Sequence, residues 1–278
     1  MSTGSIRESL RAVGSGSRRT RGVCRMPLLC VSIAAIGCQT AMVRSGVPLP
    51  SEGTRVLLMP PDVEVYVETA AGMLEPQARE SAEAMRSLTA AIGGFLDERG
   101  GEIVEFTESE DPERQHLHQQ IQKLHRVVAR AVADAKYIQM EGQPVATRAE
   151  RLPTMKGRFE WSLGEETRAL QQDSGARYAL FVFVNDSRPG AHRVGVMAVV
   201  STAFGVAPLM GEQEAYASLV DLETGNLVWF NYLYREGTAG ALSPAGVDIL
   251  GIPVMGAERA SRRFVAQLLD ALPLAGAP

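Results

Sequence analysis

The sequence predicts a single α/β domain built on one mixed sheet, with helices mainly on one face, after a signal peptide and a tether. Residues 176–185 are rich in aromatic and β-branched side chains, as is typical of a strand buried on both faces. Residues 215–233 predict a hairpin whose turn contains Gly225, a residue that readily adopts a positive φ. Patterns of helical and strand spacing alternate along the rest of the domain, which favours an α/β architecture.

The first half of the domain begins with two strand patterns and a helix. Residues 54–59 predict a strand, closed by two prolines that cannot donate to a ladder. Residues 62–68 alternate polar and apolar side chains, which predicts either a half-buried strand or an extended edge. Apolar residues at helical spacing predict a helix from 77 to 98, and the glycines at 100–101 end it.

The second half adds one strand and three helices to the central strand and hairpin. Residues 102–107 predict a strand, and residues 112–137 a helix whose apolar face is Leu117, Ile121, Leu124, Val128, Ala131 and Val132. A short helix at 165–172 leads into the central strand, and a final helix at 257–272 is predicted to pack on the sheet. No repeat of 20–50 residues is present, so one domain is expected over residues 54–278.

The first 38 residues differ from the rest of the chain. Residues 1–25 are rich in arginine and contain one acid, Glu8, and residues 26–38 are apolar or small. This order is typical of a secretory signal peptide. The apolar run is shorter than the roughly 20 residues that span a bilayer as a helix. An ordinary signal peptide with a coincidental cysteine, or an uncleaved anchor, remains an alternative.

The end of this leader, Ala35-Ile-Gly-Cys38, resembles the lipobox of bacterial lipoproteins, although that family prefers leucine at the position of Ala35. The resemblance implies a signal peptide over 1–37, acyl chains on Cys38 and a lipid-anchored flexible tether over 38–53. Because Gln39 follows instead of an acid, it also implies the outer membrane, with the domain facing the periplasm. The other cysteines lie in the leader, so no intrachain disulfide is expected after cleavage.

Two apolar segments flank the hairpin, at 194–210 and 237–256, and the second contains a single charge, Asp248. One interpretation is a core strand or helix with a buried loop. The other is an exposed apolar surface for self-assembly or bilayer contact. The residues that would form such an assembly surface are Val194, Val196, Met197, Val199, Phe204, Ile249 and Ile252.

The usual catalytic and cofactor motifs are missing from the sequence. It contains no phosphate-binding glycine loop, no H-E-x-x-H, no C-x-x-C and no G-x-S-x-G elbow. The net charge of −4 argues against a nucleic-acid partner, because phosphate binding usually requires a basic surface. We therefore expect no catalytic residue, no metal and no cofactor.

We expect structural roles for the individual polar and aromatic residues. His118 and His125 are interpreted as part of a solvated helix face. The acids at 62–68 are expected to form a solvent-exposed edge of the sheet, although a pair of carboxylates there could act in general acid/base catalysis. Trp161 and Trp229 are predicted to be packing anchors.

Five segments together resemble an uncharacterised family of proteobacterial lipoproteins: residues 56–63, 74–76, 152–161, 178–184 and 217–231. The hairpin pattern Asp-x-x-Thr-Gly-x-x-x-Trp also resembles lipoproteins of the curli-secretion-channel type and the amino-terminal domain of TolB. That resemblance implies a fold like the anticodon-binding domain and work in envelope assembly or export, in several cases as rings.

These observations lead to three functional hypotheses. The first is a non-enzymatic, lipid-anchored envelope protein, an assembly, export or structural factor that contacts another copy of itself or another envelope protein. The second is a monomeric periplasmic binding module for a small ligand or cell-wall fragment, with a pocket near Asp62 and Trp161. The third is an enzyme that uses the acids at 62–68.

Overall fold

The computed structural model describes residues 41–44, 49–51, 53–100, 102–136, 159–205, 209–238 and 258–274. All of them belong to one of two compact units of the chain, Cys38–Pro278. The predicted signal peptide, Cys38 and half of the tether lie outside the described residues, as do Ile249 and Ile252. Among the helices that the structure describes, none is long and apolar enough to span a membrane.

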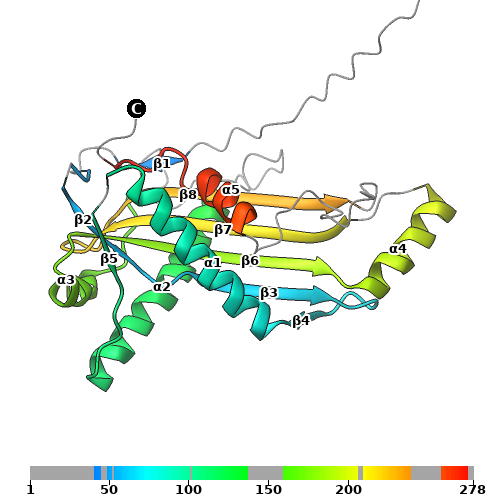
Figure 1. The fold of residues 1–278 in the computed structure, drawn as a ribbon, viewed down its shortest axis with the longest axis horizontal. Helices are drawn as coiled ribbons and strands as arrows, with labels where there is room; N and C mark the ends of the chain where they lie inside the picture. Colours follow the sequence, from blue (N-terminus) through cyan, green and yellow to red (C-terminus); the bar gives the residue numbers. More distant parts are fainter. Residues whose placement is uncertain are drawn as a thin grey trace, which may run out of the picture. The chain divides into compact units, whose positions relative to one another are not determined.

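The described residues form eight strands, five α-helices and one short 3₁₀ helix (Figure 1). The strands are β1 (Met42–Val43), β2 (Arg55–Leu58), β3 (Asp62–Glu68), β4 (Leu74–Pro76), β5 (Glu102–Glu105), β6 (Tyr178–Pro189), β7 (Leu209–Asp221) and β8 (Leu227–Thr238). The helices are α1 (Ala78–Asp97), α2 (Pro112–Lys136), η4 (Glu165–Thr167), α3 (Arg168–Ser174), α4 (Ala191–Phe204) and α5 (Glu258–Leu268). The predicted α/β domain with one mixed sheet is confirmed.

The long strand β6 is the centre of the sheet. The strand order of the sheet is β1-β8-β7-β6-β2-β5. On one side of β6, β7 pairs antiparallel with β6, and β8 pairs antiparallel with β7. On the other side, β2 pairs in parallel with residues 178–180 and β3 pairs in parallel with residues 183–189. The strands β5 and β4 lie outside β2 and β3, respectively. Residues 62–68 therefore form a strand that pairs along its whole length with β6, and its last three residues also pair with β4.

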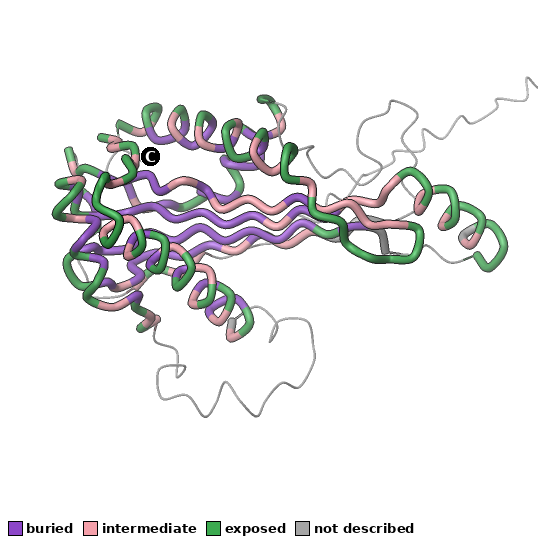
Figure 2. Tube along the Cα trace, turned by 90° about the horizontal axis from the view of Figure 1, so that it is seen from below, coloured by how far each residue is buried: buried purple, intermediate pink, exposed green. Residues whose placement is uncertain are grey.

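Helices cover both faces of the sheet, which corrects the expectation that they lie mainly on one face (Figure 2). Helices α1 and α5 pack on the face that carries Leu180, whereas α2 and α3 pack on the face that carries Phe181. The physical reason lies in β6 itself. Its run of apolar side chains points alternately to the two faces, so both faces must be shielded from water.

The predicted hairpin between β7 and β8 is confirmed, and Gly225 is its critical residue. Gly225 has a φ of 72°, and a Cβ atom at this position would lie 2.0 Å from the carbonyl oxygen of Gly164. The Asp221 carboxylate accepts a hydrogen bond of 2.9 Å from the Glu223 N–H within the same turn. The turn therefore requires glycine both for its backbone conformation and for the close approach of a second loop.

Several element boundaries differ from the prediction; the hairpin, for example, was predicted over 215–233, but β7 begins at Leu209 and β8 ends at Thr238. Strand β6 does not end at Asn185, because Asp186 and Ser187 still pair with both β3 and β7. The last helix ends at Leu268, earlier than expected. The sequence patterns did not predict helix α4 or strands β1 and β4. Where they did locate an element, tertiary pairing determined how far the strand extends.

Candidate functional site

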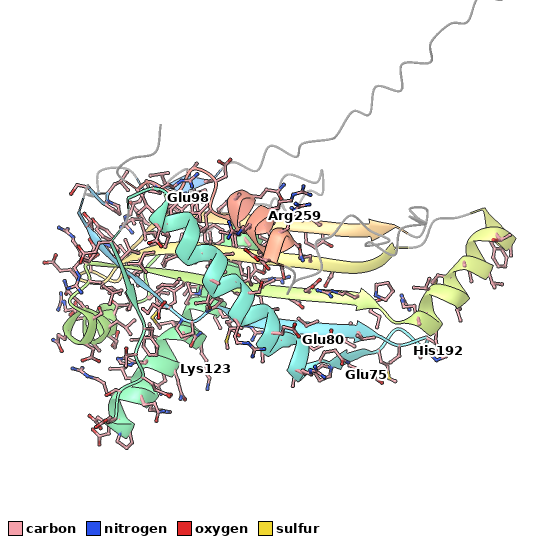
Figure 3. All side chains as sticks on the ribbon, in the orientation of Figure 1. Glu75, Glu80, Glu98, Lys123, His192 and Arg259 are labelled. Atoms are coloured by element: carbon pink, nitrogen blue, oxygen red, sulfur yellow. The ribbon has the colours of Figure 1, made fainter. Side chains whose placement is uncertain are left out.

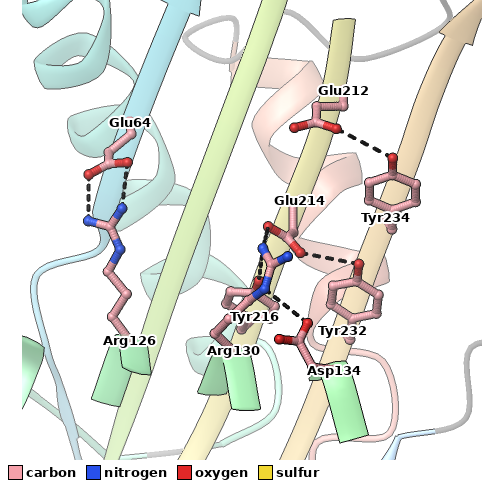
Figure 4. A network of polar contacts seen from close by, with 9 residues as sticks. All are labelled: Glu64, Arg126, Arg130, Asp134, Glu212, Glu214, Tyr216, Tyr232 and Tyr234. Atoms are coloured by element: carbon pink, nitrogen blue, oxygen red, sulfur yellow. Dashed lines mark hydrogen bonds and ion pairs between the residues drawn. The ribbon is translucent and has the colours of Figure 1, made fainter. Parts of the chain in front are cut away.

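Acidic and tyrosine side chains gather on the α2 side of the sheet (Figure 4). We call this group the polar face: Asp62, Glu64, Tyr66, Glu212, Glu214, Tyr216, Tyr232 and Tyr234 from the strands, with Arg126, Arg130 and Asp134 from α2. Alternate residues of a strand point to the same face, and Tyr216 pairs with Tyr232 while Glu214 pairs with Tyr234. The register therefore places side chains from separate strands next to one another.

One half of the polar face is centred on Arg126. Its guanidinium makes two hydrogen bonds with Glu64, one of 2.7 Å, and lies 3.8 Å from the Asp62 carboxylate. It also lies over the ring of Phe183, 4.5 Å from the ring centroid. Burial raises the pKa of Asp62, and the charge of Arg126 partly opposes this effect. Arg126 thus orients Glu64 and partly compensates the charge of Asp62.

The other half is centred on Arg130 and Glu214. One guanidinium nitrogen of Arg130 lies 2.7 Å from Glu214 and 3.3 Å from the Tyr216 hydroxyl, and the Tyr232 hydroxyl donates to Glu214 at 3.3 Å. The Nε–H of Arg130 donates a hydrogen bond of 3.0 Å to the Asp134 carboxylate. Burial, reinforced by the Glu214 carboxylate, raises the pKa of Tyr216 and Tyr232. Both phenols are therefore neutral hydrogen-bond donors at neutral pH.

The polar face is a preorganised surface of hydrogen-bonding groups. Its carboxylates are bound by guanidinium and phenol groups. Among the described residues, no three His, Cys, Asp or Glu side chains are grouped so that they could hold a metal ion. Asp62 lies beside the middle of β6, whereas the carbonyl of Trp161 accepts from Leu227 at the start of β8. The structure therefore does not bring together the two residues expected to mark a pocket.

The two histidines expected on a solvated face of α2 are buried, so that prediction is wrong. His118 is 3% exposed, and its Nε2 atom lies 2.9 Å from the Asp173 carboxylate. His125 is 2% exposed, lies 2.9 Å from the Ser218 hydroxyl and stacks on Phe181. The buried stripe of α2 is His118, Ile121, His125, Ala129, Val132 and Ala133. Leu124, which the sequence predicted on the apolar face, is 42% exposed, so the predicted face of α2 is wrong at this position. The polar partners of the buried histidines are distant in the chain and could not be recognised from helical spacing.

Helix α4 exposes apolar side chains to solvent. Val196, Val199 and Phe204 are 45%, 69% and 75% exposed, and Val194 and Met197 are half-buried. The alternative of a buried core element is therefore wrong for residues 194–204, the helical part of the first apolar segment. An ion pair of 2.6 Å between Arg193 and Glu68 fixes the start of α4, close to the exposed His192 (Figure 3).

The two tryptophans have the packing roles expected of them. Trp229 is fully buried in the core between the sheet and helices α1 and α5, and Trp161 packs partly buried against the opposite core. Arg259 lies on the exposed side of α5 (Figure 3). Sequence analysis did not single out Arg126 or Arg130, because their partners belong to strands far along the chain.

Comparison with known proteins finds similarity of structure only. No family model matches the chain, and no curated protein matches it. The PelC dodecamer structure from Paraburkholderia phytofirmans is similar to this chain at 11% identity, with a TM-score of 0.34. That similarity covers 85% of this chain and 98% of the other.

Two other solved structures are also similar to this chain. Lipoprotein GNA1162 from Neisseria meningitidis is 16% identical, with a TM-score of 0.28 over 69% of this chain and 88% of its own. The LpoB C-terminal domain from Salmonella enterica is 12% identical, with a TM-score of 0.25 over 69% of this chain and 86% of its own. At these values the similarity assigns neither a family nor a function, so the resemblance to an uncharacterised lipoprotein family stays a prediction.

Proposed function

We propose that this chain is a lipid-anchored protein of the cell envelope, facing the periplasm, that acts without catalysis through contacts between copies of itself. The observation that carries the proposal is helix α4, which presents Val196, Val199 and Phe204 to solvent. Removing apolar surface from water stabilises an association by about 25 cal/mol per Å². A second copy that covers α4 would gain this energy.

Charge around α4 favours contact with a second copy. No Asp or Glu occurs between Asp186 and Glu212. The two arginines nearest the start of the helix already have partners, since Arg188 pairs with Asp186 and Arg193 pairs with Glu68. Two copies could therefore bring their α4 helices together without placing unpaired like charges opposite each other.

The lipid anchor is the second part of the proposal, and it depends on the lipobox-like end at Cys38. Acyl chains there would hold the protein at a membrane, and the Gly, Pro and Ser residues of the tether would leave the domain free to meet its neighbours. Mass spectrometry of the extracted protein tests this part separately. The expected result is an N-terminal Cys38 that carries acyl chains, and an unmodified N-terminus at Met1 would contradict it.

The native mass of the full chain in detergent tests the contact, measured by light scattering with the detergent contribution subtracted. We expect a discrete oligomer that Val199→Asp converts to a monomer. The matched control is Val127→Asp, which changes an equally exposed valine on α2, 67% exposed, and should leave the oligomer intact. Both substitutions are at exposed positions and should change the free energy of unfolding by no more than about 0.5 kcal/mol. A monomeric parent chain would refute the proposal.

A second candidate is a monomeric binding module, and the polar face is the observation that favours it. Tyr232, Tyr234 and Glu64 are each partly exposed. Arg126 binds Glu64, the Tyr232 hydroxyl donates to Glu214, and the Tyr234 hydroxyl donates to Glu212. Such a surface suits a polar ligand such as a cell-wall fragment. A monomer whose thermal stability rises when soluble peptidoglycan fragments are added would support this candidate instead.

A further inference from the structure

The segment that leads into the domain is fixed to the edge of the sheet at strand β1. Met42 pairs with Phe230 of β8, and the Arg44 N–H donates to a carbonyl of β8 at 2.9 Å. Ala41 packs against the core between the sheet and helices α1 and α5, whereas Met42 packs against the opposite core. Residues 41–44, within the segment expected to be a flexible tether, are therefore part of the folded domain.

This docking limits how far the proposed lipid anchor can lie from the domain. Ala41 is three residues after Cys38, and each residue of an extended chain spans at most about 3.6 Å. The Cα atom of Cys38 must therefore lie within roughly 11 Å of that of Ala41. Acyl chains on Cys38 would bring the edge formed by β1 and β8 to the membrane surface. The domain would still diffuse in the plane of the membrane and meet its neighbours, but with this edge towards the bilayer.

Helix α5 lies beside this edge. The Asn231 side-chain amide, one residue after the Phe230 that pairs with β1, donates to the Leu268 carbonyl at 2.9 Å. The buried residues of α5 are Ser261, Phe264, Val265 and Leu268. At 3.6 residues per turn, Arg259 and Arg263 lie on the opposite side of the helix from this buried stripe, and both are exposed.

The exposed side of α5 has positive charge that the domain does not neutralise. Three arginines and one glutamate give the helix a net charge of +2. The glutamate, Glu258, is bound to Arg262 at 2.8 Å. Within the part of the chain that the structure describes, Arg259 and Arg263 take part in no ion pair. An arginine close to an anionic bilayer favours the bound state by about fivefold.

We propose that α5 and the β1–β8 edge form the membrane-facing surface of the protein, where Arg259 and Arg263 bind the phosphates of anionic lipid headgroups. A guanidinium suits this role because it can donate two hydrogen bonds to one phosphate. The α2 side of the sheet is less suited, because its Arg126 and Arg130 are already bound to carboxylates. This inference rests on the proposed lipid anchor, since two free arginines are too few to hold the protein at a membrane.

Electron paramagnetic resonance of the full, acylated chain in lipid vesicles tests this orientation. A nitroxide label is attached to one introduced cysteine, either Ala266→Cys on the exposed side of α5 or Val127→Cys on the exposed side of α2. The vesicles contain phosphatidylglycerol and a small share of lipid with a nickel-chelating headgroup. We expect the nickel to relax the label at position 266 at least about threefold more than the label at position 127. Vesicles of phosphatidylcholine with the same nickel lipid should show a smaller difference.

Reversing one charge tests the role of the arginines. Arg263→Glu should lower the relaxation at position 266 by at least about threefold, because an anionic surface repels the new carboxylate. The matched control is Lys123→Glu, the same change of charge at an exposed residue of α2, which should leave the relaxation within about 1.5-fold.

Two kinds of failure are distinguishable. If the chain carries acyl chains and floats with the vesicles, equal relaxation at the two positions, or equal effects of the two glutamate variants, would overturn this inference and leave the lipid anchor standing. A chain that mass spectrometry shows to lack acyl chains, and that does not float with the vesicles, would overturn the proposed anchor and this inference together.

Discussion

Lowering the pH from 7 to 5 should destabilise the fold through one side chain, the imidazole of His125. His125 is 2% exposed, stacks on Phe181 with ring centroids 4.7 Å apart, and meets the hydroxyl of the buried Ser218 at 2.9 Å. Burial lowers the pKa of His125 to about 3, because the interior solvates the imidazolium poorly. In the unfolded chain the pKa of a histidine is about 6.5.

The difference between these two pKa values fixes the sign and size of the effect. Between pH 6.5 and pH 3 the unfolded state binds a proton at His125 that the folded state does not, so stability is lost as the pH falls. At pH 5 the unfolded histidine lies about 1.5 pH units below its pKa, and each unit corresponds to about 1.36 kcal/mol. We therefore expect His125 to cost about 2 kcal/mol at pH 5. Domains are usually stable by only about 5–15 kcal/mol, so this loss is measurable.

Urea unfolding at pH 7 and pH 5, followed by the fluorescence of the buried Trp229, measures this cost. The comparison variant is the double substitution His125→Phe with Ser218→Ala, because His125→Phe alone would leave the Ser218 hydroxyl buried without a partner. The parent chain should lose about 2 kcal/mol more than this variant between the two pH values. His116→Gln, at an exposed histidine, should behave like the parent. Equal losses in the parent and the double variant would refute the reasoning.

Two further predictions concern the hairpin turn and the orientation of α2, each tested by urea unfolding at pH 7. Gly225→Ala should destabilise the fold by at least about 2 kcal/mol, because a Cβ would meet the Gly164 backbone and the φ is positive. Gly94→Ala, in the exposed interior of α1, should instead stabilise it by about 0.5–1 kcal/mol, and an equal loss at both glycines would contradict this reasoning. Ile121→Ala should cost about 2–5 kcal/mol because Ile121 is 2% exposed, and Leu124→Ala should cost far less because Leu124 is 42% exposed. Equal losses would mean that the apolar face predicted from the sequence, which contains both residues, is the correct one.

The strands, the hairpin and α1 could be predicted from the sequence because their residues carry local signals. Continuous β-branched and aromatic runs marked β6, and Gly225 marked the turn before β8. The orientation of α2 could not be predicted in the same way. The spacing of apolar residues predicts that Leu124 is buried, whereas the structure buries His118 and His125, whose Nε2 atoms lie beside Asp173 and Ser218, residues far away in sequence.

The candidate sites were less predictable than the fold, for two physical reasons. Helix α4 is apolar around its whole circumference, so no periodic pattern separated a buried side from an exposed one. The polar face depends on the register of separate strands, which places Glu64, Glu214 and Tyr232 near one helix. Sequence spacing within one element contains no information about such a convergence.

Site-specific cross-linking from α4 tests the central claim, that this helix contacts a second copy, most directly. A photoreactive amino acid is placed at Val199, and in a parallel sample at the equally accessible Val127 of α2, in the full chain in its native membrane. We predict a cross-linked dimer from position 199 and none from position 127, with the cross-linked peptide mapping to α4 of the second copy. Cross-links from position 199 to lipid alone, or no difference between the two positions, would contradict the account.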